Sequence, residues 1–238
     1  MIYVVGIGPG DVAHMTYRAR EVIEKVDVIV GYKTYVKLIE PLITTQLVES
    51  NGMRGEVVRC EKAIEYSRSG KTVAVISSGD PGVYGMAGLI LELSEGLDSV
   101  EIIPGVTASS AGAALLGAPL MHDYCHISLS DLMTPIEAIM NRVKAAASSD
   151  FVICLYNPKS HGRPEYIKQA LDIISEQQGG DILVGLAKDA GRIHEQTHVF
   201  KIDQVDFDRI DMTTVVIVGN RSTRLIGNRM VTPRGYHV

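Results

Sequence analysis

The sequence predicts an α/β fold with two α/β domains, the first built on a mostly parallel sheet and the second on a mixed sheet. Short β-branched runs alternate with segments of helical periodicity from the first residues onward. Strands joined by helices run mostly parallel, because only a crossover lets the chain re-enter the sheet in the same direction. Consecutive strand patterns at 182–187, 197–202 and 213–218 predict an antiparallel portion near the end.

The first domain is expected to span residues 1–117 and to alternate strands with helices. Its strands are expected at 2–5, 26–30, 73–76 and 100–103, and its helices at 15–25, 56–68, 84–93 and 108–116. The helix at 108–116 is rich in alanine and glycine, which allow close packing on a sheet.

The second domain is expected to span residues 118–238, with no true linker before it. Besides the three late strands, it is expected to contain strands at 126–129 and 151–156 and helices at 135–146 and 165–177. The segment 232–236 is expected to be irregular.

Composition excludes several classes of protein. The net charge is −5, tryptophan is absent and aromatic residues make up only 5% of the 238 residues, which argues against a nucleic-acid binder. The longest apolar runs have the length of strands, far short of the roughly 20 residues of a membrane-spanning helix. The first residues do not resemble a signal peptide. Three cysteines without CxxC spacing predict free thiols rather than disulfides, and a cytoplasmic protein is expected.

Three glycine-rich turns follow predicted strands in the first half. They are Gly6–Asp11, Ser77–Gly85 and Pro104–Ala108. Open α/β sheets hold small ligands at the carboxyl ends of their strands, where these turns would lie. The three turns together therefore predict one ligand held mostly by main-chain atoms.

The first turn does not match the dinucleotide-binding pattern GxGxxG, because position 11 is aspartate. A carboxylate at that point would repel a pyrophosphate. Asp27 is about 20 residues further on, but it precedes its strand and so lies at the wrong end to reach a ribose. A P-loop is excluded because no Gly-Lys-Ser or Gly-Lys-Thr follows. A plain structural turn stays open as the other interpretation.

Asp80, in the second turn, has two interpretations. Its carboxylate could accept hydrogen bonds from the hydroxyls or from a cationic group of a ligand. It could also cap a helix that starts near Pro81, where proline is favoured in the first turn. The two roles are compatible.

Other chemical motifs are weak. His122 and His126 are four residues apart, but on a strand this spacing covers about 13 Å, so a shared metal is not expected. No metal site, and no nucleophile beside a base, is predicted from the sequence. Basic residues stand singly in the expected loops and would form a carboxylate site only if several converged. They are Lys33, Arg54, Lys159, His161, Arg163, Lys188, Arg192 and Arg221.

Taken together, several segments resemble the tetrapyrrole methyltransferases of cobalamin and siroheme biosynthesis. They are VVGIGPGD, SSGDPGVYGMA, IPGVTASSAGAALLGAPLMHDYCHISLSD, the Tyr156-Asn157-Pro158 turn and VIVGNRST. GYKTYV, APLMHDYCHISLSDL and TPRGY resemble the branch that methylates C17 of precorrin-3B or cobalt-precorrin-3 and contracts the ring. The resemblance covers essentially the whole chain.

The resemblance implies an active site in the cleft between two domains, a homodimer, and S-adenosyl-L-methionine as the methyl donor, with S-adenosyl-L-homocysteine as product. The implied donor contacts are Pro9, Ser78, Gly79, Asp80, Val83, Thr107, Ala108, Tyr156, Asn157 and Ala190. The Ala190 match is the least alike. The implied substrate is a tetrapyrrole whose carboxylates would explain cationic loops on an acidic protein.

Ring contraction requires a new carbon–carbon bond and a lactone, and both steps could use a general acid or base. The candidates are His122, Asp123, His126, Asp11 and Lys33. Three alternatives stay open: a precorrin methyltransferase for another ring position, an enzyme of the diphthine synthase type, and a non-catalytic nucleotide-binding module. The sequence does not indicate whether the substrate carries cobalt.

Overall fold

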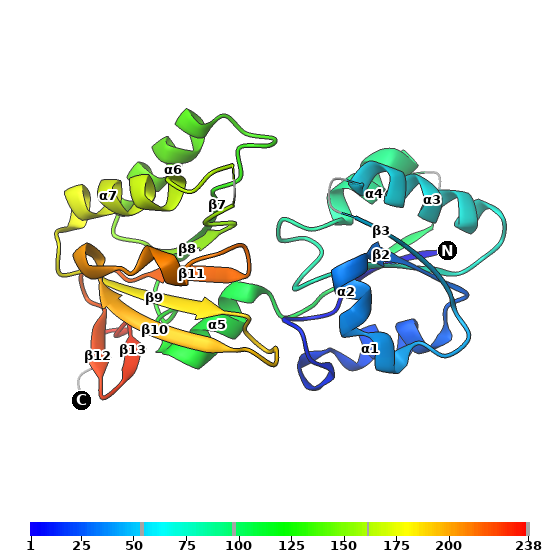
Figure 1. Cartoon of the computed structure of the whole chain (residues 1–238), viewed down its shortest axis with the longest axis horizontal. Coiled ribbons are helices and arrows are strands. Elements are labelled where there is room, and N and C mark those ends of the chain that lie inside the picture. Colours follow the sequence, from blue (N-terminus) through cyan, green and yellow to red (C-terminus); the bar gives the residue numbers. More distant parts are fainter. Residues whose placement is uncertain (53–54, 97–98, 161, 237–238) are drawn as a thin grey trace. The chain divides into compact units, whose positions relative to one another are not determined.

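The structure is a computed structural model that describes residues 1–52, 55–96, 99–160 and 162–236. The chain forms two compact units, Met1–Ala108 and Ser109–Val238 (Figure 1). Each unit has its own sheet with helices packed against it, so the predicted α/β class, with a parallel sheet followed by a mixed sheet, is confirmed. No helix within the described ranges is both long and apolar enough to cross a lipid bilayer.

The Met1–Ala108 unit is built on a five-stranded sheet in which every pair of neighbouring strands is parallel. The strands are β1 (Ile2–Gly6), β2 (Val28–Tyr32), β3 (Leu47–Asn51), β4 (Val73–Ser77) and β5 (Val100–Ile103). Their order across the sheet is β3-β2-β4-β1-β5. The central strands β1 and β4 are buried on both faces, which explains their nearly continuous β-branched sequences.

Helices cover both faces of this sheet, as its parallel connections require. They are α1 (Tyr17–Lys25), α2 (Lys33–Leu38), α3 (Glu56–Arg68) and α4 (Ala87–Ser94). Val5 packs in a core with α1, whereas Val4 packs in a second core with α3 and α4. Successive residues of a strand point to opposite faces, so the two cores lie on opposite sides of the sheet.

The Ser109–Val238 unit has a mixed sheet. Its strands are β7 (Tyr124–Ser128), β8 (Val152–Tyr156), β9 (Leu183–Lys188), β10 (Gln196–Lys201) and β11 (Thr214–Val218), in the order β10-β9-β11-β8-β7. β7 and β8 are parallel, and the remaining neighbours are antiparallel. The predicted antiparallel portion is therefore confirmed.

Two layers of helix cover this mixed sheet. Helices α6 (Ile136–Ser148) and α7 (Tyr166–Gln178) pack on one face. Helix α5 (Ala108–Leu116) packs on the other face, where a Cβ added to Gly112 would lie 2.7 Å from the Val215 side chain and 2.9 Å from that of Ala187. This close approach explains the small residues of α5. It also explains why the compact units divide after Ala108, the first residue of α5, whereas the expected boundary after residue 117 placed the whole helix in the first domain.

The remaining elements are short. A three-stranded sheet contains β6 (Gly117–Ala118), β12 (Arg224–Ile226) and β13 (Arg229–Val231), in the order β12-β13-β6. The 3-10 helices are η1 (Val12–His14), η2 (Glu40–Leu42), η3 (Ile202–Gln204) and η4 (Phe207–Arg209).

The structure contains elements that the sequence analysis did not predict. Besides the two-residue strand β6 and the 3-10 helices, these are α2, β3 and the β12–β13 hairpin. β3 is an edge strand with a mostly exposed, partly polar sequence, so its periodicity is weak. The hairpin turns at Gly227-Asn228, a residue pair that is typical of hairpin turns and that could have indicated it. Helix α4 begins at Ala87 rather than at the predicted residue 84, because Tyr84 has a φ of 54° and so is not helical.

Candidate functional site

The chain leaves β1 and β4 in opposite directions. From β1 it crosses β4 to reach β2, and from β4 it crosses β1 to reach β5. The helices of these crossovers, α1 and α4, accordingly lie on opposite faces of the sheet. Such a divergence is a topological switch point, and open α/β sheets bind ligands there, beyond the carboxyl ends of the strands. The predicted turns Gly6–Asp11 and Ser77–Gly85 lie at this point.

The glycine turns of the Met1–Ala108 unit meet as bare backbone. The amide of Gly79 donates to the carbonyl of Gly8 at 2.8 Å, and the amide of Gly8 donates back at 3.2 Å. A Cβ added to Gly105 would lie 2.2 Å from the carbonyl oxygen of Gly79 and 2.8 Å from the backbone of Gly6. A side chain at Gly105 would separate the turns, so glycine is required for this contact.

Asp80 links two of these turns. One carboxylate oxygen accepts from the backbone amide of Gly82 at 2.8 Å, and the other accepts from the amide of Gly105 at 3.0 Å. The interpretation that Asp80 caps a helix starting near Pro81 is wrong, because the next helix begins at Ala87. The carboxylate instead fixes the second turn against the third.

The second turn also holds an unusual backbone conformation. Tyr84 has a φ of 54°, a left-handed value that bulky residues rarely adopt. Such conformations persist only where the surrounding structure imposes them, and they cluster at ligand-binding sites. The loop after β4 is thus both glycine-rich and locally strained.

Most of the expected donor contacts lie in these three turns. They are Pro9, Ser78, Gly79, Asp80, Val83, Thr107 and Ala108. A Cβ added to Gly79 would lie 3.6 Å from Cα of Thr107 and 3.7 Å from the amide of Ala108, so the second and third turns are in contact. The structure thus brings the three turns that carry these residues into contact.

The other expected donor contacts belong to the Ser109–Val238 unit and share one edge of its sheet. Tyr156 ends β8 and Asn157 follows it, while Ala190 lies two residues after β9. Both strands are antiparallel to β11, so their carboxyl ends are at the same edge. Asn157 and Asp189 have left-handed φ values of 51° and 50°, which Asn and Asp tolerate better than most residues.

His126 belongs to a polar network that the sequence did not indicate. Its Nε2 lies 2.8 Å from the hydroxyl of Ser109, and the Ser109 amide donates to the hydroxyl of Tyr156 at 2.9 Å. The rings of His126 and Tyr156 are 5.2 Å apart. The sequence analysis predicted no nucleophile beside a base, and it did not indicate this buried hydroxyl beside an imidazole. Ser109 is completely buried, so this pair is suited to fixing Tyr156 rather than to acting as an exposed nucleophile.

This network predicts a pH dependence of stability. Burial lowers the pKa of His126, so the folded protein keeps the ring neutral at pH values where the unfolded chain, with a pKa of about 6.5, takes up a proton. Its contribution to stability is present above about pH 6.5 and is lost as the pH falls through and below that value. Glutamine cannot be protonated in this pH range. Between about pH 7.5 and about pH 5, we therefore expect the free energy of unfolding to fall less in His126→Gln than in the native protein. Urea titrations measure this, and equal falls in both proteins would contradict it.

Two further catalytic candidates lie in the Met1–Ala108 unit. Asp11 caps η1, and its carboxylate accepts from the backbone amide of His14 at 3.0 Å and contacts His14 Nδ1 at 2.9 Å. Slight burial acts to raise the pKa of Asp11, but the hydrogen bonds from His14 outweigh it and lower that pKa. Asp11 is therefore a stable carboxylate. Lys33 is exposed at the first residue of α2.

His122 and Asp123 lie just before β7, and both line a pocket of about 330 Å³. His126 is on β7 itself, as the predicted strand required. Within the described part of the chain, no three His, Cys, Asp or Glu side chains are grouped so that they could hold a metal ion.

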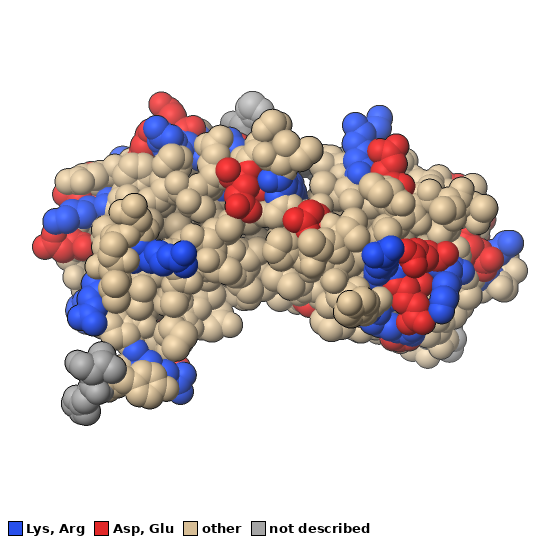
Figure 2. Space-filling model, turned by 90° about the horizontal axis from the view of Figure 1, so that it is seen from below, with Lys and Arg blue, Asp and Glu red and all other residues tan. Residues whose placement is uncertain are grey.

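Several of the single basic residues already have protein partners. Lys188 forms an ion pair with Asp211 at 2.6 Å, and Arg163 pairs with Asp131 at 3.2 Å. Lys159 donates to the carbonyl of Phe207, which leaves these side chains little freedom to converge on a ligand. Arg54 and His161 lie outside the described residues. Basic side chains also pair with acidic side chains on α1, where Figure 2 shows Lys and Arg intermingled with Asp and Glu.

The Met1–Ala108 unit thus has the architecture of a class, the open α/β proteins with a topological switch point, which bind small ligands at this place. Residues 1–206 match the family of tetrapyrrole (corrin/porphyrin) methylases. The chain belongs to this family. A curated relative from Salmonella typhimurium, named as a probable cobalt-factor III C(17)-methyltransferase, is 49% identical over 99% of both chains.

Solved structures agree with this assignment. The crystal structure of the methyltransferase CobJ matches with a TM-score of 0.93 and 35% identity, over 98% of this chain and 99% of that one. A uroporphyrin-III C-methyltransferase from Thermus thermophilus, complexed with S-adenyl homocysteine, matches with a TM-score of 0.71 and 19% identity over 92% of this chain and 96% of that one. At that identity the second match supports the fold alone.

Proposed function

We propose that this chain transfers a methyl group from S-adenosyl-L-methionine to C17 of cobalt-precorrin-3 or precorrin-3B, with ring contraction, in cobalamin biosynthesis. The observation that carries the proposal is the convergence of three glycine turns at the switch point of a tetrapyrrole methylase. The name of the Salmonella relative supports C17 as the position. A methylase for another ring position is the main alternative.

The proposed donor contacts are Pro9, Ser78, Gly79, Asp80, Val83, Thr107, Ala108, Tyr156, Asn157 and Ala190. We propose S-adenosyl-L-methionine as the donor and S-adenosyl-L-homocysteine as the product, in line with the match to the tetrapyrrole methylase family; the Thermus protein of the same fold was solved with S-adenyl homocysteine. A donor held by main-chain amides and carbonyls needs side chains small enough for close approach, as glycine provides.

The chemistry of the transfer places little demand on a protein nucleophile. An electron-rich carbon of the macrocycle attacks the methyl carbon of the sulfonium, and the electron pair of the broken carbon–sulfur bond stays on sulfur. Alignment of carbon, methyl and sulfur supplies much of the acceleration. Contraction of the ring needs proton transfers, for which His122, Asp123, His126, Asp11 and Lys33 remain our candidates.

We expect the substrate to carry cobalt, because the Salmonella relative is named for cobalt-factor III. The metal would then be part of the substrate rather than a resident cofactor. The metal-free substrate precorrin-3B is the other case to be tested.

The proposal is tested by incubating the purified protein with ¹³C-methyl-labelled donor and each candidate tetrapyrrole, with and without cobalt. We expect the mass of one acceptor to rise by one labelled methyl group, and NMR to place that carbon at C17. Methylation at another carbon would identify a different member of the family. Calorimetry with the donor, NAD and ATP tests the non-catalytic alternative, which predicts comparable affinities for all three.

We also propose that the protein is a cytoplasmic homodimer that binds neither nucleic acid nor membranes. Its three cysteines are free thiols, and burial raises the pKa of Cys154 to about 12 and those of Cys60 and Cys125 to about 11. Unreactive, unpaired thiols are typical of proteins from a reducing compartment. Sedimentation equilibrium measures the oligomeric state, and a monomer at micromolar concentration would contradict the dimer.

A further inference from the structure

We propose that the pocket of about 330 Å³ in the Ser109–Val238 unit binds a carboxylate group. His122, Asn220 and Arg234 line it, each from a different segment. It lies beside the first residues of β7 and β8, whereas Tyr156 is the last residue of β8. Because a five-residue strand spans about 13 Å between its first and last residues, the pocket is a separate feature from the edge that holds Tyr156.

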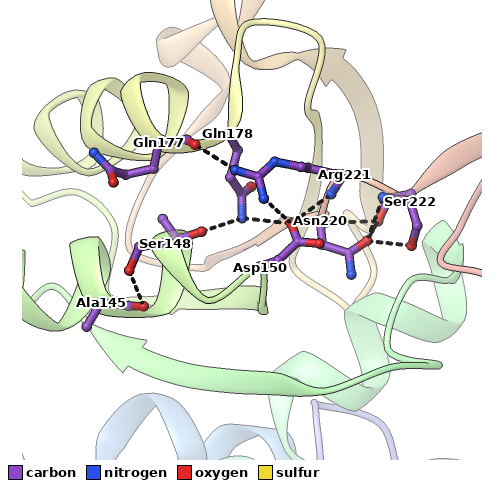
Figure 3. Close-up of polar contacts among 10 residues, drawn as sticks. Ala145, Ser148, Asp150, Gln177, Gln178, Asn220, Arg221 and Ser222 are labelled. Atoms are coloured by element: carbon purple, nitrogen blue, oxygen red, sulfur yellow. Dashed lines mark hydrogen bonds and ion pairs between the residues drawn. The ribbon is translucent and has the colours of Figure 1, made fainter.

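Asn220 provides the first argument. It is only 4% exposed, and its side-chain oxygen accepts three hydrogen bonds, from the amide and hydroxyl of Ser222 and from the hydroxyl of Thr223. Within the described ranges its amide nitrogen has no acceptor, and Figure 3 draws no contact to that nitrogen. That nitrogen is not among the described buried side-chain atoms without a partner, so it is accessible and can donate to an acceptor oxygen in the pocket.

His122 offers a second donor. Its Nδ1 accepts from the backbone amide of Asp123 at 2.8 Å, which assigns the proton of the neutral ring to Nε2. The same Nδ1 lies 3.5 Å from the carboxylate of Asp123, a contact that would need the proton on Nδ1. The hydrogen bond from the Asp123 amide is the shorter of the two contacts, so we place the proton of the neutral ring on Nε2. Nε2 can then donate to a ligand.

Arg234 supplies the charge. It is exposed, and it forms no ion pair with any described residue. Figure 2 shows positive side chains at lower left, over the hairpin that precedes it. A guanidinium can bind a carboxylate through two parallel hydrogen bonds, which makes arginine the preferred residue for this recognition.

The two acidic residues that line the pocket do not cancel these donors. Asp150 accepts from the backbone amide of Arg221 at 3.1 Å and from Gln178 at 3.4 Å, and the Arg221 guanidinium lies 4.0 Å away (Figure 3). Asp123 is 81% exposed, so water screens its charge. Asp150 is thus partly compensated by Arg221 and Asp123 is screened. The donors of His122, Asn220 and Arg234 are therefore the groups that we propose meet an anion.

The size of the pocket limits the ligand. Small-molecule pockets range from about 300 to 1,000 Å³, and this one is at the lower end. It suits an acetate or propionate group, or a small dicarboxylic acid, rather than a whole macrocycle. The source of the carboxylate is either a peripheral group of the tetrapyrrole acceptor or a separate small acid.

Nuclear magnetic resonance titration of the ¹⁵N-labelled full chain with sodium succinate, against sodium chloride at equal ionic strength, tests the site. We expect saturable shifts of the backbone amides of Ser222 and Gly235. Asn220→Asp keeps the accepting oxygen but replaces the free donor by an anionic oxygen, and we expect it to lose saturable binding. Arg234→Gln should weaken binding roughly tenfold.

Arg224→Gln is the matched control, because Arg224 is an exposed arginine of β12 that forms no ion pair with a described residue and does not line the pocket. It should leave succinate binding unchanged. No saturable shift in the native protein would overturn the proposal, as would equal weakening by Arg224→Gln, which would indicate a diffuse cationic surface.

A second measurement distinguishes the two sources and rests on the proposed function. If the carboxylate belongs to the acceptor, Arg234→Gln raises the acceptor KM roughly tenfold and leaves the donor KM unchanged. If it belongs to a separate acid, succinate binding falls while both KM values stay the same. Absence of methyl transfer by the native protein would contradict the proposed function, but the succinate titration would still decide the site.

Discussion

Replacing Gly105 by alanine is expected to abolish binding of the donor and to destabilise the protein. The new Cβ would lie 2.2 Å from the carbonyl oxygen of Gly79 and 2.8 Å from the backbone of Gly6. These neighbours are main-chain atoms that are held by strands β1 and β4, so they cannot turn aside as a flexible side chain would. The third turn must move instead, and it would draw Thr107 and Ala108 away from Gly79. We expect a loss of stability of about 3 kcal/mol, at the upper end for overpacking.

Calorimetry with S-adenosyl-L-homocysteine and urea unfolding measure the two effects. Gly88→Ala is the matched control, because Gly88 is exposed in α4 and an added Cβ would meet nothing within 4 Å. Alanine there should stabilise the helix by about 0.5–1 kcal/mol and leave donor binding unchanged. A Gly105→Ala protein that binds the product as tightly as the Gly88→Ala protein would remove the third turn from the donor site.

Much of the fold could be predicted because strand sequences in a parallel sheet reflect burial on both faces. The run Val73–Ile76 is apolar throughout, and the structure buries all of it in β4. The limits of α3, α5 and β5 also agree with the structure, since turn residues or a change of periodicity mark both ends. Exposed or very short elements, such as β3 and the β12–β13 hairpin, lack this signal and were missed.

The glycine turns could be predicted individually, but the reason for each glycine could not. Gly105 does not have a left-handed φ. Glycine is required there because Gly6 and Gly79, which are far away in the sequence, leave no room for a Cβ atom. The chain order of the strands does not reveal which turns touch. That information comes from the order β2-β4-β1-β5, which places the third turn beside the first.

Polar networks were the least predictable part of the candidate sites. Ser109 and His126 are 17 residues apart, and only the packing of α5 on the sheet brings the hydroxyl to the imidazole. Three hydrogen bonds to the side-chain oxygen of Asn220 fix its amide group, so the nitrogen is the atom that is left to donate. A sequence gives the residue type but not which of its atoms are already in use.

Removal of the Asp80 carboxylate is expected to weaken donor binding by a factor of about ten or more, equivalent to ~1.4 kcal/mol. In Asp80→Ala the amides of Gly82 and Gly105 lose their acceptor, so the second turn is no longer fixed against the third. Asp80→Asn should have an intermediate effect, because its amide oxygen can accept from one of these amides while its NH₂ group faces the other.

Comparison of the donor with its product separates the two roles of Asp80. Both carboxylate oxygens are occupied by backbone amides, so we expect Asp80→Ala to weaken S-adenosyl-L-methionine and S-adenosyl-L-homocysteine equally. A direct contact with the cationic sulfonium would instead weaken the donor more than the uncharged thioether of the product. Calorimetry with both ligands measures the difference, and urea unfolding of the variant shows whether it is still folded. A folded variant with native affinity for both ligands would exclude Asp80 from the donor site.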